Sequence, residues 1–297
     1  MTVKIHLTSY FLPLYGVTVK DILTSDKELV MPELKDLPAL DAAAARDWID
    51  RWDRQQEVYM PDREERFTAL IDAVEAGAGR PDPLVLDLGC GPGSLAVRLL
   101  ARLPAATVVA VDADPVTLAL GRCGYAAVPG LRFVDVDLRQ SDWVSPLGLA
   151  AGRPVDAVVS TTALHWLSVT QLRELYVTLA GLLRPGGLFL DGDHLHVDET
   201  ANPVLGRLER ALEEREAGRR YPDGHAGRAE SWDEWWQAAA ADPALAEAAA
   251  ERSQSLVHHS NEGAQLTAHT SALRAAGFAE VGTLWQRGSS RVLCGVR

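Results

Sequence analysis

Short apolar runs alternate with longer amphipathic segments through the middle of the chain. Five runs rich in Val, Leu and Ala are typical of buried strands, near residues 83–88, 107–112, 131–136, 155–160 and 187–193. Between them, apolar residues recur three and four positions apart, which predicts helices near 94–103, 115–122 and 169–183. Strands and helices in alternation predict a parallel sheet with right-handed crossovers, so the expected fold class is α/β.

The C-terminal segment follows a different pattern. Residues 266–276 predict a helix that ends at Gly277. Two strands follow, near 281–286 and 291–296, and the residues Gly288-Ser289-Ser290 join them. The chain is therefore expected to end in a two-stranded hairpin.

Further helices are predicted before this core. Asp41 is a suitable N-cap for a helix over residues 41–59, and Pro61 can start a second helix that runs to residue 75. Residues 1–40 are irregular and could form an arm that docks on the body or on a second subunit, which would make the protein a homodimer. We expect residues 1–80 to form a first region, made of the arm and these helices, and residues 81–297 to form the core.

The core carries one long insertion. Residues 197–263 separate the fifth strand from the C-terminal helix, and this stretch is too long for a plain loop. It contains a charged helix over 203–215, a loop rich in Gly and Arg over 218–228, and a Trp-rich helix that Ser231 can cap. Because the carboxyl end of the fifth strand faces the ligand crevice in open α/β sheets, we expect the insertion to cap the substrate.

The composition disfavours several classes of protein. The chain has 297 residues, 47% hydrophobic and 24% charged, and its net charge of −12 without a basic stripe disfavours nucleic acid as a partner. Cys90, Cys123 and Cys294 lack metal-ligand spacing and suit a reducing compartment, so we expect a cytoplasmic protein. No apolar run reaches the roughly 18 residues of a membrane span, and no signal peptide is recognised, so no membrane partner is expected.

The first chemical signal is the segment 85–93, Val-Leu-Asp-Leu-Gly-Cys-Gly-Pro-Gly. A buried strand that includes Asp87 runs into a turn with Gly89, Gly91 and Gly93, and a helix follows. Glycines let the backbone approach a ligand where a Cβ would collide, and the N-terminus of the helix adds free N–H donors. A ligand with both a cationic amine and a carboxylate would suit this mixture of an acid and N–H donors.

The second strand narrows the class of ligand. It ends in Asp112, 21 residues after Gly91, and acids at about this distance hold ribose hydroxyls in nucleotide-binding βαβ units. A nicotinamide dinucleotide is disfavoured, because the spacing is G-x-G-x-G and Asp87 would repel a nearby phosphate. The sequence has no Walker, G-x-S-x-G or H-E-x-x-H motif, so triphosphatase, hydrolase and metalloprotease functions have no support.

These features together resemble the class I S-adenosylmethionine-dependent methyltransferases. The resemblance rests on residues 87–93 with 111–112, and on three further segments in the same order, 134–138, 155–166 and 183–190. It covers residues 82–195 closely and 265–297 more loosely. It implies a Rossmann-like, doubly wound sheet of seven strands, mostly parallel with an antiparallel last strand, and N-terminal helices that form a lid over the cofactor.

The resemblance implies S-adenosylmethionine as the cofactor and a set of contacts to it. Asp112 would hold the ribose, and Asp137 would meet the adenine amino group. The full set of implied cofactor-binding residues is Asp87, Gly89, Cys90, Gly91, Asp112, Ala113, Asp137, Leu138 and Thr161, with Tyr59 and Arg63 from the lid helices.

The acceptor side of the site is less defined. The run Leu164-His165-Trp166-Leu167 is similar to the active-site loop of carboxyl methyltransferases of the trans-aconitate and juvenile-hormone-acid type. His165 is the candidate catalytic base, and its alternative role is to shape the pocket or contact the cofactor. The candidate contacts to the acceptor are Trp166, His194 and Trp236, although the stripe of Trp232, Trp235 and Trp236 is in the first place a packing pattern.

We predict a methyltransferase of secondary metabolism with a small-molecule acceptor, acting by O-methylation of a carboxylate or a hydroxyl group. A carboxylate is already ionised, whereas a hydroxyl would benefit from a base. N- or C-methylation of a metabolite or small peptide is an alternative, and so is a protein that binds S-adenosylmethionine without transferring methyl groups. No metal is expected, because the histidines lack ligand spacing.

Overall fold

The structure is a computed structural model, and it describes residues 39–150, 152–221, 230–255 and 264–297. Residues 38–297 form one compact unit. The predicted N-terminal arm, His258 and His259, and most of the predicted Gly- and Arg-rich loop lie outside the described residues. The homodimer and the region boundary at residue 80 therefore stay predictions.

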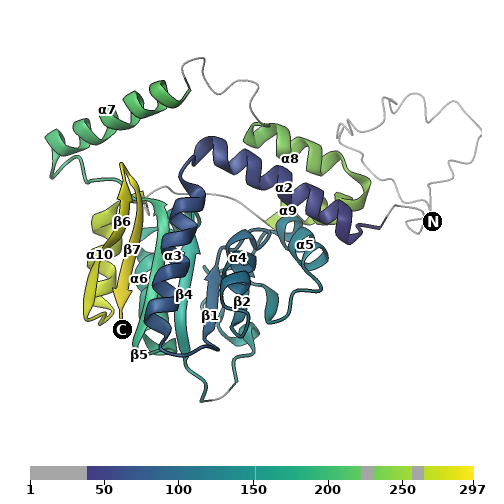
Figure 1. Ribbon diagram of the computed structural model, residues 1–297, viewed down its shortest axis with the longest axis horizontal. Coiled ribbons are helices and arrows are strands. Elements are labelled where there is room, and N and C mark those ends of the chain that lie inside the picture. The colour runs from purple at the N-terminus through teal and green to yellow at the C-terminus, as the bar shows by residue number, and fades with distance from the viewer. Residues whose placement is uncertain (1–38, 151, 222–229, 256–263) are drawn as a thin grey trace, which may run out of the picture. The chain divides into compact units, whose positions relative to one another are not determined.

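A seven-stranded sheet lies at the centre of the described residues, in the order β3-β2-β1-β4-β5-β7-β6 (Figure 1). The strands are β1 (Leu84–Leu88), β2 (Thr107–Asp112), β3 (Leu131–Asp135), β4 (Val155–Thr161), β5 (Leu183–His194), β6 (Glu280–Arg287) and β7 (Ser290–Val296). Strands β1 to β5 pair in parallel, and β7 pairs antiparallel with both β5 and β6. The predicted doubly wound sheet with an antiparallel last strand is confirmed.

Helices cover both faces of the sheet. They are α2 (Ala42–Tyr59), α3 (Arg63–Ala78), α4 (Ser94–Arg102), α5 (Pro115–Gly124), α6 (Val169–Leu182), α7 (Pro203–Arg220), α8 (Trp232–Ala241), α9 (Ala246–Ser255) and α10 (Leu266–Ala275). Leu86, Val109 and Phe189 belong to a core shared with α6 and α10, and Val85 and Leu190 to one shared with α3 and α4. Since both faces are covered, a ligand can reach the sheet at the carboxyl ends of its parallel strands.

A third core joins the predicted lid to the predicted cap. Trp48 and Ile49 of α2 pack with Leu120 of α5 and Trp235 of α8. The rings of Trp48 and Trp235 meet edge to face with centroids 5.5 Å apart, and Trp48 Nε1 donates to Asp242 at 2.9 Å. The two segments, far apart in sequence, thus form one structural layer (Figure 1).

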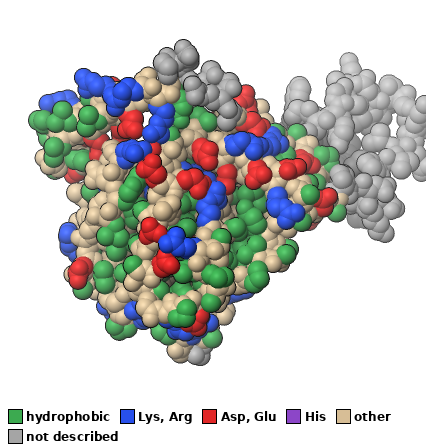
Figure 2. Space-filling view, in the orientation of Figure 1, with side chains coloured by type: hydrophobic (Ala, Val, Ile, Leu, Met, Phe, Trp, Pro, Cys, Tyr) green, Lys and Arg blue, Asp and Glu red, His purple; other side chains and the backbone are tan. Residues whose placement is uncertain are grey.

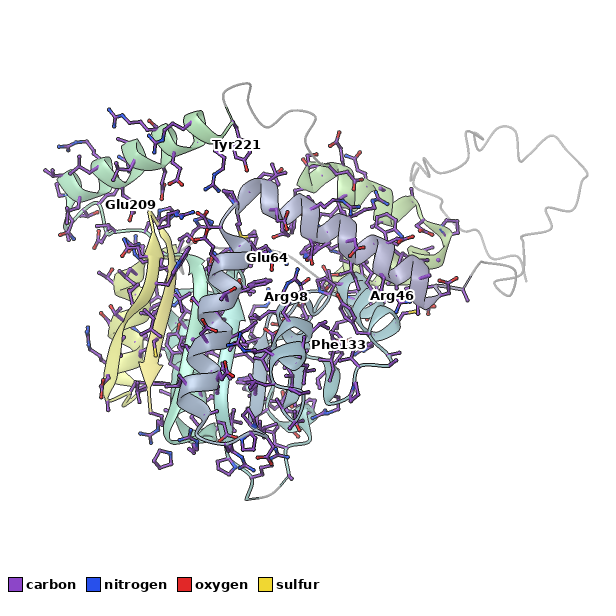
Figure 3. All side chains as sticks on the ribbon, in the orientation of Figure 1. Arg46, Glu64, Arg98, Phe133, Glu209 and Tyr221 are labelled. Atoms are coloured by element: carbon purple, nitrogen blue, oxygen red, sulfur yellow. The ribbon has the colours of Figure 1, made fainter. Side chains whose placement is uncertain are left out.

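The corner between α2 and α3 is tied to α4 by Asp53. Its carboxylate accepts a hydrogen bond from Ser94 Oγ at 2.6 Å and from Arg98 at 3.1 Å, and it pairs with Arg63 at 2.9 Å. Arg98 also donates to Glu64 of α3 at 2.8 Å (Figure 3). Because Ser94 begins the helix that follows the glycine turn, these bonds hold the lid helices against that turn.

Most predicted element boundaries agree with the structure to within a few residues. The cap at Asp41 is confirmed, since its Oδ1 accepts from the N–H groups of Ala43 and Ala44 at 2.9 and 2.8 Å. The second lid helix starts at Arg63, two residues after Pro61.

Two boundaries and one element differ from the prediction. Strand β5 begins at Leu183 rather than near residue 187, because Leu183 already pairs with Val155 and the chain then passes through a register shift with Gly186 at φ +72°. Helix α7 runs five residues beyond the predicted end at residue 215, to Arg220. Helix α9 was not predicted.

Helix α7 touches the rest of the described residues through polar groups. Glu209 pairs with Arg291 at 2.7 Å, and Glu213 accepts from the N–H of Ser289 at 2.7 Å. In the space-filling view, apolar side chains gather on α7, and acidic and basic groups lie among and beside them (Figure 2). The exposed apolar residues of α7 are Val204, Leu205, Leu208 and Leu212.

Candidate active site

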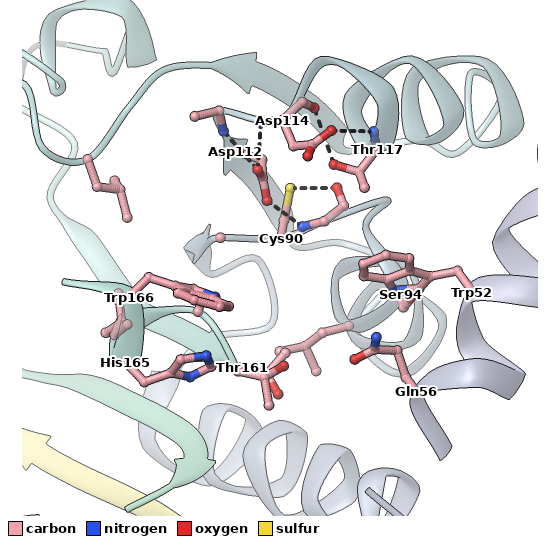
Figure 4. Close-up of a pocket in the computed structure, with 18 of the residues that line it drawn as sticks. Trp52, Gln56, Cys90, Ser94, Asp112, Asp114, Thr117, Thr161, His165 and Trp166 are labelled. Atoms are coloured by element: carbon pink, nitrogen blue, oxygen red, sulfur yellow. Dashed lines mark hydrogen bonds between the residues drawn. The ribbon is translucent and has the colours of Figure 1, made fainter. Parts of the chain in front are cut away.

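A pocket opens at the carboxyl ends of β1, β2 and β4, beside Trp52 and Gln56 of α2 (Figure 4). Trp232 and Trp236 of α8 also line it. Its volume is about 720 Å³, within the range of small-molecule sites. It lies where the strand order reverses, between β1 and β4, which is where open α/β sheets bind ligands. All the predicted site residues except Asp87 line this pocket.

The glycine turn forms one wall of the pocket. Gly89 and Gly91 have φ angles of +67° and +53°, which other residues rarely adopt. A Cβ on Gly89 would lie 2.2 Å from the Cβ of Ala163, whereas a Cβ on Gly91 would meet only Trp52, at 3.8 Å. The N–H groups of Gly89 and Cys90 both bond Val111 O. The turn therefore offers space for a ligand, and its own N–H groups at Gly89 and Cys90 are occupied.

Asp112 stands at the edge of the turn. Its Oδ2 accepts from the N–H of Gly91 at 2.7 Å, and its Oδ1 accepts from Ala113 and Asp114 at 2.8 and 2.9 Å (Figure 4). Burial raises its pKa to about 6, and these backbone bonds oppose the rise. Each carboxylate oxygen can accept more than one hydrogen bond, so Oδ2 keeps capacity for a ligand hydroxyl.

Asp87 lies behind the pocket wall. It is fully buried, and apart from a weak bond from the backbone N–H of Ala96 its carboxylate oxygens have no hydrogen-bond partner. Burial, and then the charge of Asp112, raise its pKa to about 7. A buried acid with so few hydrogen-bond partners destabilises a fold. Its direct contact with the cofactor stays a prediction.

The loop after β3 contributes Asp137 and Leu138. Asp137 accepts from the N–H of Arg139 at 2.9 Å and pairs with the Arg139 side chain at 2.7 Å. Burial raises the pKa of Asp137, but the bonds from Arg139 outweigh burial and hold it below its usual value. Together with Ala113, these residues make a partly apolar wall with one charged acceptor.

The end of β4 is strained beside the pocket. Thr162 lines the pocket with a φ of +50°, the one positive value at a non-glycine residue in the described part of the chain. Its N–H donates to Gly192 O at 3.0 Å. Left-handed backbone at a β-branched residue is rare and clusters at functional sites. Thr162 was not predicted as a site residue.

The two lid residues take different positions. Arg63 is buried, pairs with Asp53, and lies over the ring of Phe67 at 4.5 Å. Tyr59 is 54% exposed, and its hydroxyl accepts from the N–H of Trp232 at 3.3 Å. Tyr59 thus links the end of α2 to the start of α8 across the mouth of the pocket.

His165 is oriented by a buried carboxylate. Its Nδ1 lies 2.8 Å from Oδ2 of Asp193, and Oδ1 of Asp193 accepts from the N–H of His194 at 2.7 Å. Burial lowers the pKa of His165, but the charge of Asp193 and the hydrogen bond to it hold that pKa above its usual value. The pair leaves Nε2 as the ring nitrogen for a partner in the pocket.

A second acid lies two residues before Asp193 on β5. Asp191 is fully buried without a hydrogen-bond partner, and its nearest histidine is His269, at 3.6 Å. Burial and the charge of Asp193 raise the pKa of Asp191 well above its usual value. The Tyr176 hydroxyl lies 2.5 Å from His269 Nδ1 in this buried group.

Arg66 reaches the same acids from the other face of the sheet. It is almost fully buried, and it donates to Thr161 Oγ1 at 3.2 Å and to Met60 Sδ at 3.1 Å, two groups that line the pocket. Its charge helps to lower the pKa of Asp193, which burial raises and His165 lowers more strongly.

The remaining predicted acceptor contacts also face the pocket. Trp236 lies under the guanidinium of Arg252 at 3.7 Å, and its indole N–H is buried without an acceptor. Nδ1 of His194 lies 3.2 Å from Ser289 Oγ, and burial, then the charge of Arg66, lower the pKa of His194. Their contact with an acceptor stays a prediction.

Sequence reasoning missed Asp193 as the partner of His165. The two residues are 28 positions apart, and the pairing of β4 with β5 brings them together. The signal that could have found Asp193 is an acid at the carboxyl end of a buried strand, the same pattern that identified Asp112.

The described residues lack two further features. They contain no group of three or more His, Cys, Asp or Glu side chains that could hold a metal ion. None of their helices is long and apolar enough to cross a membrane.

Comparison with known proteins assigns the central part of the chain to a domain family. A family model described as a methyltransferase domain matches residues 85–187. Trans-aconitate 2-methyltransferase of Azoarcus sp. (strain BH72) is 32% identical over 167 residues, 53% of this chain and 59% of that protein. An uncharacterised methyltransferase of Mycobacterium tuberculosis (strain ATCC 25618 / H37Rv) is 38% identical over 122 residues, 41% of this chain and 54% of that protein. The chain spans just over half the length of these two relatives.

Solved structures are similar at a more distant level. Human N-acetylserotonin methyltransferase in complex with S-adenosylmethionine has a TM-score of 0.49 and 15% identity, over 86% of this chain and 57% of that chain. The apo form of the methyltransferase SibL has a TM-score of 0.44 and 21% identity, over 76% and 54%. Such scores are too low to add to the match in sequence. The family model identifies residues 85–187 as a methyltransferase domain, and the strand order is the one that the resemblance to class I S-adenosylmethionine-dependent methyltransferases implies.

Proposed function

We propose that the chain is an O-methyltransferase that uses S-adenosylmethionine and a small-molecule acceptor. The observation that carries the proposal is the His165–Asp193 pair in a pocket that the glycine turn also lines. A buried carboxylate that orients a histidine is an arrangement for proton transfer at the other ring nitrogen. Relatives named trans-aconitate 2-methyltransferase favour an acid as the acceptor.

The pocket residues fit S-adenosylmethionine, which supplies a methyl group on a positively charged sulfur when bound. The free capacity of Asp112 Oδ2 suits a ribose hydroxyl. The space in front of Gly91 admits a ligand close to the backbone. Ala113, Asp137 and Leu138 would surround the adenine, and Arg63 would face the methionine carboxylate, because these residues line the same pocket.

His165 can serve two kinds of acceptor. When the imidazole is neutral, Nδ1–H donates to Asp193 and Nε2 can take the proton of a hydroxyl acceptor. When the imidazole is protonated, Nε2–H can donate to a carboxylate acceptor, which needs no base. Because Asp193 holds the pKa of His165 above its usual value, the protonated form persists to higher pH than in a free imidazole.

Cofactor binding is tested by calorimetry with S-adenosylmethionine. Asp112→Ala should weaken binding by about tenfold or more, because it removes a charged acceptor for a hydroxyl. The matched control is Asp135→Ala: Asp135 is the register partner of Asp112 at the end of β3 and does not line the pocket. Absence of binding by the unmodified protein would refute the proposal.

Transfer to oxygen is tested with S-adenosylmethionine labelled in its methyl group, incubated with the protein and a panel of acids, phenols and amines. Mild alkali releases labelled methanol from a methyl ester and leaves a methyl ether or a methylamine intact. A label that moves only to nitrogen or carbon would contradict O-methylation and keep the methyltransferase assignment. Loss of transfer in His165→Ala, with cofactor affinity kept, is the expected result for the proposed role of His165.

A further inference from the structure

Three large aromatic side chains stay exposed at the mouth of the pocket. Tyr59, Trp166 and Trp232 are 54%, 39% and 38% exposed, and all three line the pocket. They come from the end of α2, the loop after β4 and the start of α8. Exposed aromatics that converge on one cavity indicate a ligand that covers them. We call these three residues the aromatic rim.

The cationic side chains that line the pocket already have acidic partners. Arg63 pairs with Asp53 at 2.9 Å, and Arg252 pairs with Asp114 at 2.6 Å. The third, Arg139, pairs with Asp137 at 2.7 Å. Lysine does not occur among the described residues that line the pocket. Arg63 keeps a buried Nη1 without a hydrogen-bond partner, which the proposed function assigns to the methionine carboxylate, so the arginines left for an acceptor are Arg139 and Arg252, both paired with acids.

The anionic side chains reinforce this balance. The carboxylates of Asp112, Asp114 and Asp137 also line the pocket. Their negative charges offset the positive charges of the three arginines on the pocket surface. Arg66 lies behind Met60 and Thr161 and faces the buried acids of β5. Of the two histidines that line the pocket, His194 bonds Ser289 through Nδ1 and has a lowered pKa, whereas His165 bonds Asp193, has a raised pKa, and is the better placed to carry a positive charge toward an acceptor.

We propose that the acceptor has a planar or aromatic apolar body with a single acidic or hydroxyl group, and that it is not a polycarboxylate. This inference rests on the proposed function, because it assigns the rest of the pocket to S-adenosylmethionine. The aromatic rim would cover the body of the acceptor, and His165 would meet its one ionisable group. Each further carboxylate would enter the pocket without a free cation, and a charge buried without a partner strongly weakens binding.

The test compares acids of similar shape and different charge. The full chain is titrated by calorimetry with trans-aconitate and with three aryl monoacids: cinnamate, indole-3-acetate and 1-naphthoate. Each titration is run with and without S-adenosylhomocysteine. At least one aryl acid should bind about tenfold more tightly than trans-aconitate. Tighter binding of trans-aconitate than of every aryl acid would overturn the proposal.

Variants of Trp232 connect the result to the aromatic rim. Trp232→Ala should weaken aryl-acid binding by about tenfold and leave S-adenosylhomocysteine binding unchanged. Trp232→Lys should instead strengthen trans-aconitate binding, because it adds an unpaired cation at the rim. Leu284→Ala, an exposed apolar position on β6 outside the pocket, is the control. Unchanged aryl-acid affinity in both Trp232 variants would refute the role of the rim.

A separate assay with labelled S-adenosylmethionine measures methyl transfer to the same acids. If trans-aconitate becomes labelled and the aryl acids do not, the inferred acceptor class is overturned and the proposed O-methyl transfer stands. Aryl-acid binding to a protein that does not bind S-adenosylhomocysteine would support the acceptor class and refute the proposed methyl transfer.

Discussion

At the scale of single residues, two equally buried acids on β5 have pKa values shifted in opposite directions. Asp193 has a histidine, a backbone N–H and a nearby guanidinium as neighbours, which outweigh burial and lower its pKa. Asp191 lacks hydrogen-bond partners among the described residues, and its pKa is raised. Environments that separate the pKa values of neighbouring acids assign their roles. Asp193 is therefore the charged partner of His165, and Asp191 is the acid of the two whose charged form is disfavoured.

This contrast predicts the effect of Asp193→Asn. In the unmodified protein the charge of Asp193 orients His165 and raises the pKa of His165, and the amide removes that charge. With a hydroxyl acceptor, kcat should therefore fall by about 100-fold or more. The acidic limb of the residual pH–rate profile should move to lower pH, because the pKa of His165 falls. The measurement is kcat/KM against pH with labelled S-adenosylmethionine.

Asp191→Asn is the matched control for that variant. It changes an acid of equal burial that does not contact His165, so the pH–rate profile should keep its position. If both variants lost activity equally without a shift of the profile, Asp193 would act through packing alone.

At the scale of elements, two helical glycines should respond to alanine with opposite signs. Gly121 in α5 faces the glycine turn, and a Cβ there would lie 2.6 Å from the Phe133 ring and 2.7 Å from Pro92 O. Gly181 in α6 has nothing within 4 Å of its Cβ position. Gly121→Ala should destabilise the fold by about 1 to 3 kcal/mol through overpacking. Gly181→Ala should stabilise it by about 0.5 to 1 kcal/mol through helix propensity. Urea unfolding of both variants measures the difference, and equal signs would contradict the packing account.

The same scale explains which elements could be predicted. Runs such as Thr107-Val108-Val109 are β-branched and buried, so their pattern identified β2 directly. Helix α9 consists mostly of Ala, Glu, Gln and Ser, and it packs through small side chains such as Ala248 and Ala249, so no stripe of large apolar residues marks it. The pocket positions of Gly89, Gly91 and Asp112 followed from one local motif. The pairing of Asp193 with His165 required the β4–β5 register, which no local pattern encodes.

At the scale of the whole molecule, the fold keeps acids that oppose its own stability. The pKa of Asp87 rises from an ordinary 3.8 to about 7, and that of Asp112 to about 6. A raised acid pKa means that the folded state holds a proton which the unfolded state has already lost. The contribution of these acids is therefore neutral below about pH 4 and increasingly destabilising as pH rises to the folded pKa. Asp193, with its lowered pKa, contributes in the opposite sense and loses its contribution as pH falls.

Asp87→Asn separates the stability of the fold from its function. The neutral amide has no charge to desolvate, so the variant should be more stable than the unmodified protein at pH 8. The difference in unfolding free energy should widen by on the order of 2 kcal/mol between pH 5 and pH 8, because the unmodified protein ionises Asp87 over that interval. Urea unfolding of the ligand-free proteins at both pH values measures it, and a gap independent of pH would show that Asp87 does not titrate near 7. The same variant should bind S-adenosylmethionine more weakly, because the cationic amine loses a nearby negative charge. A gain in stability together with a loss of affinity would identify Asp87 as an acid retained for the cofactor.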